Sequence, residues 1–231
     1  MLAVGGDGVA DKHLEEDVKD IPPAQRLIVP ADVVELDGDM ETTELEWCGT
    51  SGLKLTLIAG LERLQKLKVI SLRSGFIRKP SGLAHLAKTL EVLELYENRL
   101  RTLEGVEMLE KLSTLDVSYN RLGAMEPAFL LPIGSHLVKL YMAENKLSEI
   151  NVEAMHSMVN LRLLDLGGNN IRKIQGLDAL VNLEELWLGK NKITKLEGLE
   201  NLAKLKRLSV QSNRLDLFYP HQRTTSNDDK K

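Results

Sequence analysis

Six asparagines recur at intervals of 22 to 25 residues in this chain of 231 residues. Each lies three residues after an aliphatic-x-aliphatic pair and two residues before another aliphatic residue; the six are Asn98, Asn120, Asn145, Asn169, Asn191 and Asn213. A unit of this length forms one short strand and a return segment, and it can bury its apolar side only by stacking on its neighbours. The spacing therefore predicts a curved solenoid.

The repeated unit aligns in one register over seven copies. It reads LKVISLRSGFI from Leu67, LEVLELYENRL from Leu90, LSTLDVSYNRL from Leu112, LVKLYMAENKL from Leu137, LRLLDLGGNNI from Leu161, LEELWLGKNKI from Leu183 and LKRLSVQSNRL from Leu205. The starts step by 23, 22, 25, 24, 22 and 22 residues, so two units are slightly expanded. This is the pattern of leucine-rich repeats. We expect an α/β solenoid of horseshoe shape in the 22-residue class, with short parallel strands on its concave face and helical or 3-10 return segments.

Strand geometry explains the pattern. With a period of two, the last two leucines of L-x-x-L-x-L point into the core, and the residues around them point to the opposite face. An asparagine turned inward carries both a donor and an acceptor, so stacked copies can satisfy backbone groups of the turning chain. Each such hydrogen bond contributes roughly 0.5 to 1.5 kcal/mol net.

The chain divides into three predicted parts. Residues 1–40 form an acidic segment that is expected to be disordered, residues 41–218 form the repeat domain, and residues 219–231 form a polar tail. Gly75 replaces the asparagine in the first unit, and the degenerate stretch from Glu44 to Leu64 is predicted to be the N-terminal cap. After Leu215 the repeat spacing stops, and Leu217, Phe218 and Tyr219 could cover the last apolar layer.

Charge is unevenly distributed. Residues 1–43 hold eleven acidic and three basic side chains, a net charge of −8, whereas the whole chain has a net charge of −4. The acidic segment is interpreted as a solvated tail, with an electrostatic arm for a basic partner as the alternative. The remaining lysines and arginines are spread among glutamates without a dense basic stripe, which argues against nucleic-acid binding.

The number of cysteines and the hydropathy of the sequence indicate the cellular compartment of the protein. No apolar run reaches the roughly 18 to 20 residues that cross a bilayer, and the first residues lack a secretory pattern, so we expect neither membrane insertion nor secretion. Cys48 is the single cysteine, and we expect it to be a small packing residue. A reducing compartment, the cytoplasm and/or the nucleus, is predicted.

Catalytic signals are missing from the sequence. The five histidines are scattered outside the strand positions, and no metal-ligand spacing, phosphate loop, nucleophile elbow or zinc-protease motif is present. The sequence therefore predicts a protein that is not an enzyme and that carries no cofactor or metal.

Function is expected on the concave face, where strand residues opposite the core are free to vary. The middle strand position gives one column, which consists of Ser71, Glu94, Asp116, Tyr141, Asp165, Trp187 and Ser209. An outward tryptophan is costly to leave in water, and tryptophan and tyrosine are enriched at interfaces. The acidic and aromatic column therefore indicates a protein-docking surface, with a merely solubilising role as the alternative for its serines.

The segment LEELWLGKNKITKLEGLENLAKLKRLSVQSNRL, starting at Leu183, allows a more specific comparison. Together with the preceding units from about residue 60, it resembles the leucine-rich-repeat regulatory subunit of protein phosphatase 1, of the subunit-7 type. The resemblance implies a non-catalytic subunit whose concave face binds the phosphatase catalytic subunit. Carried over by position, it implies contacts by Asp116, Tyr141, Asp165 and Trp187, with Glu94 and Tyr96 as additions.

Two features separate this chain from that family, whose members have further repeats and a C-terminal cap. Because DLFYPHQRTTSNDDKK, from Asp216, has neither, we expect affinity for the phosphatase to be reduced or lost. The alternative function is an intracellular adaptor of another complex, such as an axonemal dynein-assembly factor or a subunit of a spliceosomal particle, since one fold serves many functions. The free chain is expected to be monomeric.

Overall fold

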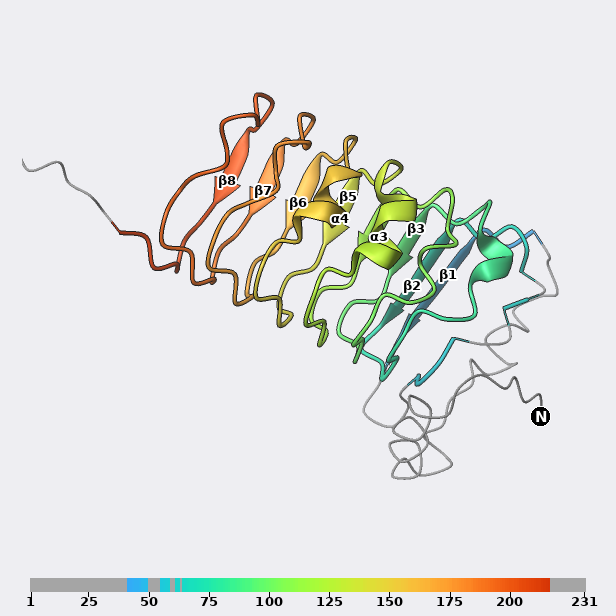
Figure 1. Cartoon of the computed structure of the whole chain (residues 1–231). Helices are drawn as coiled ribbons and strands as arrows, with labels where there is room; N and C mark the ends of the chain where they lie inside the picture. The colour runs from blue at the N-terminus through green and yellow to red at the C-terminus, as the bar shows by residue number, and fades with distance from the viewer. Residues whose placement is uncertain (1–40, 50–54, 59–60, 63, 217–231) are drawn as a thin grey trace, which may run out of the picture.

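The computed structural model of this chain describes residues 41–49, 55–58, 61–62 and 64–216. Within these ranges the chain forms one sheet of eight parallel strands in chain order (Figure 1). The strands are β1 Glu44–Cys48, β2 Val69–Arg73, β3 Val92–Glu94, β4 Thr114–Asp116, β5 Lys139–Tyr141, β6 Leu163–Asp165, β7 Glu185–Trp187 and β8 Arg207–Ser209. The predicted leucine-rich-repeat solenoid is confirmed. The predicted acidic segment, the polar tail and the lid of Leu217, Phe218 and Tyr219 lie outside the described residues.

Leucines of successive repeats stack into one continuous core. The central residue of each short strand points inward, and Leu93, Leu115, Leu140, Leu164 and Leu186 are fully buried. Their strand neighbours on either side are exposed or half-buried, as the period of two requires. A single row of aliphatic side chains therefore holds the strands in register.

The asparagines link each repeat to the one before it. The Asn145 Oδ1 accepts a hydrogen bond from the Leu122 backbone N–H at 2.9 Å, and its Nδ2 donates to the Val117 carbonyl at 3.0 Å. Equivalent pairs of bonds are made by Asn98, Asn120, Asn169, Asn191 and Asn213. The predicted satisfaction of turning backbone by inward asparagines is thus observed in every repeat from Asn98 onward.

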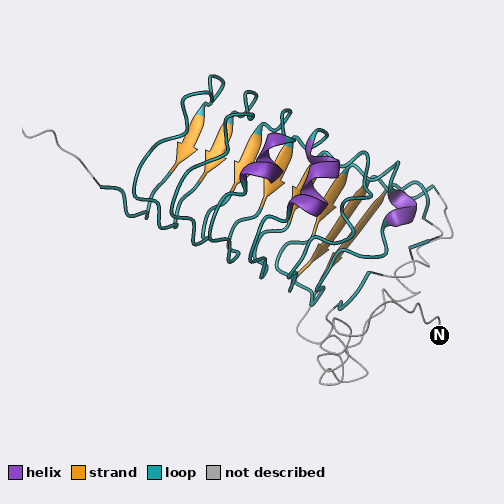
Figure 2. Cartoon of the chain, viewed as in Figure 1, coloured by secondary structure: helices purple, strands orange, loops and turns teal. Residues whose placement is uncertain are grey.

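Return segments differ in length and in secondary structure (Figure 2). The two expanded repeats, which start at Leu112 and Leu137, hold the α-helices α3 Pro127–Gly134 and α4 Val152–His156, and the repeat from Leu67 holds the 3-10 helix η2 Ala84–Leu86. The remaining described return segments run as turns and loops. Extra residues in the two expanded repeats therefore accommodate a full helical turn.

The N-terminal end of the sheet extends the repeat pattern. β1, from the predicted cap, pairs in parallel with β2, and Leu45 of β1 is buried. Gly75 stands where the later repeats carry the ladder asparagine, and it leaves no space for a side chain, because a Cβ there would lie 2.5 Å from the Asn98 Oδ1. The expectation that Cys48 packs in the protein is wrong: its thiol is exposed, since alternation along β1 directs Leu45 and not Cys48 into the core.

The C-terminal end of the described sheet is less well covered. Leu208 of β8 occupies the same strand position as the fully buried Leu186, yet it is 40% exposed. The difference arises because β8 has a neighbouring strand on one side only among the described residues. Within the described residues, the last aliphatic layer is therefore partly exposed.

Candidate functional site

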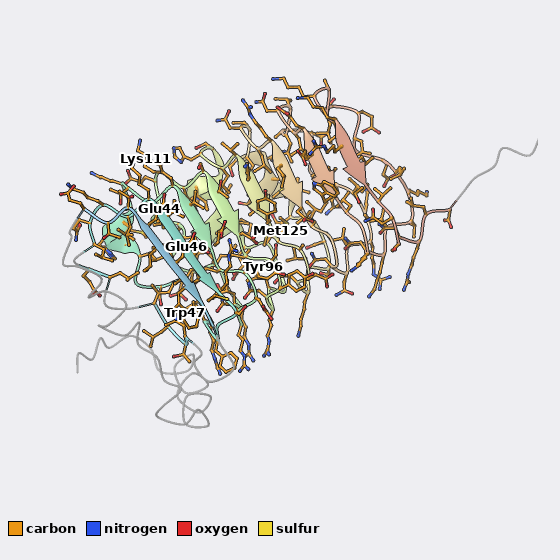
Figure 3. All side chains as sticks on the ribbon, turned by 180° about the vertical axis from the view of Figure 1, so that it is seen from behind. Glu44, Glu46, Trp47, Tyr96, Lys111 and Met125 are labelled. Carbon is orange, nitrogen blue, oxygen red and sulfur yellow. The ribbon has the colours of Figure 1, made fainter. Side chains whose placement is uncertain are left out.

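The middle strand position forms a straight row across the sheet. Strand pairing places Ser71, Glu94, Asp116, Tyr141, Asp165, Trp187 and Ser209 directly beside one another, each on the strand next to its predecessor. Neighbouring strands lie about 4.8 Å apart, so adjacent members of the row can contact one another. We call the surface that carries this row the strand face. It is the side of the sheet opposite the leucine core (Figure 3).

Five of the six predicted contact residues line one open hollow of about 360 Å³ on the strand face. They are Tyr96, Asp116, Tyr141, Asp165 and Trp187. Glu94, the sixth, lies in the same row but does not line the hollow. Its carboxylate accepts a hydrogen bond from the Ser71 Oγ at 2.9 Å and forms an ion pair with Arg73. The structure therefore gathers five of these side chains in one place and ties the other to its neighbours.

Aromatic side chains are concentrated in this hollow. Only 4% of the chain is aromatic, yet all three tyrosines of the described residues and one of the two tryptophans line it. The Tyr96 and Tyr119 rings lie 4.9 Å apart between centroids, tilted by 49°. Trp187 is 36% exposed. A surface that gathers a sparse residue type with large contact area is typical of a protein interface.

Tyr119 is a member of the hollow that the sequence analysis missed. It is 47% exposed, and its backbone has a φ of 56°, in the left-handed region that bulky residues avoid. The signal was its position directly before the ladder asparagine, where the chain leaves the strand. The same left-handed turn recurs in the other repeats, at Ser74, Glu97, Glu144, Gly168, Lys190 and Ser212.

A glycine opens a gap in this row of turn residues. Gly168 has a φ of 65°, and a Cβ on it would lie 2.4 Å from the carboxylate carbon of Glu144. Because Gly168 has no side chain, Glu144 reaches across its repeat and pairs with Lys190 at 3.4 Å. Both residues of this ion pair line the hollow, so the pair forms part of its rim.

Two carboxylates of the hollow sit in a desolvated setting. Burial raises the pKa of Asp116, an effect that the Ser118 N–H opposes by donating to the carboxylate at 2.9 Å. Burial also raises the pKa of Asp165, which accepts a hydrogen bond from the Gly167 N–H at 2.9 Å. Burial is the main cause that raises the pKa of the Tyr141 hydroxyl, and the negative charge of the nearby Asp116 raises it further. The row therefore holds negative charge that a partner carrying donors or cations would stabilise.

The N-terminal end of the row adds further acidic character. Glu46 of β1 pairs with Ser71 and continues the row by one strand, a residue that the sequence analysis left in the cap. Figure 3 labels Glu44 and Glu46 on this strand. Arg73 moderates the charge here: the hydrogen bond to Glu94 and the charge of that carboxylate raise the pKa of its guanidinium.

The described residues contain no group of three or more histidine, cysteine, aspartate or glutamate side chains placed to hold a metal ion. None of the helices in the described ranges has the length and apolar character needed to cross a membrane. What the hollow offers chemically is a combination of aromatic rings, carboxylates and hydrogen-bonding groups, a composition suited to binding a protein surface.

Comparison with known proteins identifies the repeats. Models of leucine-rich repeats match residues 110–171, and a model of two leucine-rich-repeat copies matches residues 181–221. A solved structure of internalin C2 from Listeria monocytogenes superposes with a TM-score of 0.62 at 22% identity, over 78% of this chain and 76% of that one. The functional domain of InlJ from the same organism gives a TM-score of 0.61 at 24% identity, over 75% and 35%. At these identities the likeness concerns the fold alone.

Curated relatives share part of their length with this chain. A protein phosphatase 1 regulatory inhibitor subunit PPP1R7 homolog from Arabidopsis thaliana is 34% identical over 152 residues, which are 64% of this chain and 44% of that protein. A 187-kDa microtubule-associated protein, AIR9, from the same plant is 33% identical over 108 residues, 46% of this chain and 6% of that protein. The chain thus spans less than half of either relative. It carries leucine-rich repeats, built into one parallel-stranded solenoid with a protein-interaction surface.

Proposed function

We propose that this chain is a non-catalytic regulatory subunit of protein phosphatase 1, and that its strand face binds the phosphatase catalytic subunit. The observation that carries the proposal is the hollow in which Tyr96, Asp116, Tyr141, Asp165 and Trp187 come together. The similarity to the Arabidopsis phosphatase regulator homolog supports the choice of partner. A cytoplasmic and/or nuclear location and a monomeric free state are parts of the same proposal.

The geometry of the hollow defines what a partner must present. Trp187 and Tyr141 offer exposed or half-exposed rings, while Asp116 and Asp165 alternate with them along the row. A convex element with an apolar ridge and basic or donor groups beside it fits such a row, because the rings bury area and the carboxylates receive hydrogen bonds. A helix packed across the strands supplies this combination.

Trp187 is the residue whose removal is most informative. Truncating a buried interface tryptophan commonly costs about 2 kcal/mol or more, which lowers affinity roughly thirtyfold. We expect Trp187→Ala and Tyr141→Ala to weaken binding to this extent. Leu196→Ala provides a matched control, since Leu196 is also an exposed large apolar side chain, at 52%, but does not line the hollow.

The test is a calorimetric titration of the full chain with purified phosphatase catalytic subunit. Binding by the native chain and by Leu196→Ala, with loss on Trp187→Ala, supports the proposal. Failure of the native chain to bind rejects the phosphatase as partner. Equal binding by all three chains would retain the phosphatase but remove the strand face as the contact surface. The alternative adaptor function predicts instead capture of dynein-assembly or spliceosomal components that depends on Trp187.

A further inference from the structure

A second surface runs along the edge of the solenoid at which the chain leaves the strands. The residue directly after each ladder asparagine points away from the core there, and five of these residues are basic: Arg99, Arg121, Lys146, Lys192 and Arg214. We call this row the exit ridge. None of its members lines the hollow of the strand face.

Backbone hydrogen bonds fix the exit ridge in register. The N–H of Arg121 donates to the carbonyl of Leu100 at 2.9 Å, and that of Lys146 donates to Leu122 at 2.9 Å. Lys192 and Arg214 repeat the arrangement with bonds of 2.8 and 2.9 Å to the preceding repeat. Side chains that lie 22 or more residues apart in sequence are thereby placed at steps of about 4.8 Å.

A second basic row lies beside the first. The third and fourth positions after the asparagine, or after Gly75 in the first unit, add Arg78, Lys79, Arg101, Arg172, Lys173 and Lys195. The same positions hold only two acidic residues, Glu149 and Asp216, within the described chain. Stacking of the repeats thus brings together basic residues that the sequence separates, with breaks at Asn170 in the first row and at Gly123 and Ser148 in the second.

Anions of the described residues neutralise this edge only in part. Lys79 pairs with Glu104 at 3.1 Å, and Lys173 pairs with Glu197 at 3.7 Å, both in the second row. In the ridge itself, Arg121, Lys146 and Lys192 have no ion pair within the part of the chain that the structure describes.

The opposite edge of the same sheet is arranged differently. Where the chain enters the strands, the charged residues of neighbouring repeats are opposite in sign. Lys68 pairs with Glu91 at 3.4 Å, and Glu184 forms ion pairs with Arg162 at 3.8 Å and with Lys206 at 2.7 Å. Like charges side by side on neighbouring strands are destabilising, whereas opposite charges are favourable. The entry edge thus pairs opposite charges between neighbouring repeats, whereas Arg121, Lys146 and Lys192 on the exit ridge remain available to an acidic partner.

We propose that the exit ridge binds the acidic N-terminal segment of the same chain, centred on residues 7–39. Residues 1–40 contain ten acidic and three basic side chains, so the segment has a net charge of −7, whereas the exit ridge and the second row beside it together hold eleven basic side chains. The acids fall in two groups. One runs from Asp7 to Asp20, and the other runs from Asp32 to Asp39.

Length and connection favour binding within one molecule. The exit ridge from Arg99 to Arg214 covers five repeat steps, about 24 Å at 4.8 Å per step, and a segment of some 30 residues can extend over roughly 100 Å. A covalently joined segment experiences an effective concentration of about millimolar, which a separate acidic protein seldom reaches. The contact is electrostatic, so salt should weaken it, since the Debye length falls from about 10 Å at 0.1 M to about 3 Å at 1 M.

Zero-length crosslinking of the full chain with a carbodiimide tests the proposal directly. Carboxylates of residues 7–39 should couple to Lys146, Lys192 and Lys195 at least severalfold more than to Lys204 and Lys206 on the entry edge. Raising the salt from 0.1 to 1 M should reduce the ridge crosslinks severalfold. Equal coupling to both edges would overturn the proposal. Coupling found only between molecules, in a mixture of isotopically light and heavy chains, would overturn it too.

Charge-neutralising variants supply a second measurement that does not depend on crosslinking chemistry. A spin label at Ala10→Cys, in a Cys48→Ser background, should broaden amide signals of the exit ridge. Arg121→Gln with Lys146→Gln should abolish that broadening, whereas Lys204→Gln with Lys206→Gln should leave it unchanged.

An alternative occupant of the exit ridge is a nucleic acid. The affinity of a short poly(U) RNA for the exit ridge is compared between the native chain and a variant carrying Glu15→Gln and Glu16→Gln. If the two affinities are equal, the segment does not occupy the ridge and the proposal fails. If the variant binds RNA severalfold more tightly, the segment competes for the ridge and the proposal is supported. This outcome is independent of phosphatase binding, which concerns the strand face.

Discussion

Replacing Asn145 by alanine should remove one rung of the asparagine ladder. The Asn145 Oδ1 accepts from the Leu122 N–H at 2.9 Å, and its Nδ2 donates to the Val117 carbonyl at 3.0 Å. Both partners belong to the preceding repeat, and the asparagine itself is only 7% exposed. The substitution therefore acts on the junction between two repeats at the middle of the solenoid.

Loss of the Asn145 side chain would cost a different free energy at each of these two backbone groups. The Val117 carbonyl keeps the Asn120 Nδ2, which donates to it at 3.0 Å, so its loss is that of an ordinary hydrogen bond, about 1 kcal/mol. The Leu122 N–H would be left buried without an acceptor, which costs about 2 kcal/mol. Together these give about 3 kcal/mol, a large share of the roughly 5 to 15 kcal/mol by which domains are stable.

Urea unfolding of the full chain, followed by circular dichroism and tryptophan fluorescence, measures the change. Asn170→Ala is the matched control, because Asn170 is next to a ladder asparagine but is half-buried, and its backbone N–H bond to Leu147 at 2.8 Å would persist. We expect the control to fall within about 0.5 kcal/mol of the native chain. A loss for Asn145→Ala no larger than that of the control would refute the ladder as a source of stability.

Three further predictions follow from the same geometry. Gly168→Ala should destabilise the chain by about 1 to 2 kcal/mol, because φ is positive there and the new Cβ would meet Glu144 of the preceding repeat. Gly123→Ala is the control, since a Cβ there has open space around it, and it should be neutral within about 0.5 kcal/mol. Equal effects of the two substitutions in thermal unfolding would contradict this prediction. Leu186→Ala should lower the free energy of unfolding in urea by about 3 kcal/mol, because Leu186 is fully buried. Leu208→Ala should lower it by about 1 kcal/mol, because Leu208 is 40% exposed. The reverse order would show that β8 is covered in solution. Asp116→Asn should stabilise the chain at pH 7 and have little effect near pH 3. The folded-state pKa of Asp116 is raised, so the favourable contribution of its protonated form is present at low pH and is lost as pH rises through that pKa. A stability difference that is the same at both pH values would reject the desolvation of Asp116.

Repeat period and side-chain alternation made most of the fold predictable from the sequence. Seven register-aligned units predicted seven of the eight strands, and the two expanded units, from Leu112 and Leu137, are those that hold α3 and α4. The row from Ser71 to Ser209 was predictable because parallel strands of equal repeats must align equal positions. Local pattern alone did not reveal β1, since the stretch from Glu44 to Cys48 departs from the leucine spacing.

Features that depend on backbone conformation were harder to read from sequence. Tyr119 occupies a position outside the strand, and its place in the hollow follows from a left-handed turn that sequence patterns assign to glycine or asparagine rather than tyrosine. Glu144 and Lys190 lie 46 residues apart and meet only because Gly168 between them has no side chain. The exit ridge was missed for a related reason: its charges are diluted in sequence and dense only after stacking.

Opposite charges on two surfaces of one solenoid have a consequence for selectivity. The strand face displays Glu46, Glu94, Asp116 and Asp165, so a basic partner that binds there would also attract the acidic N-terminal segment. If that segment is docked on the exit ridge, it is withheld from the partner and the strand face meets no competitor from its own chain. Releasing the segment by Arg121→Gln with Lys146→Gln should therefore weaken binding of a basic partner to the strand face, although neither residue lines the hollow. Unchanged affinity in that variant would mean that the two surfaces act independently.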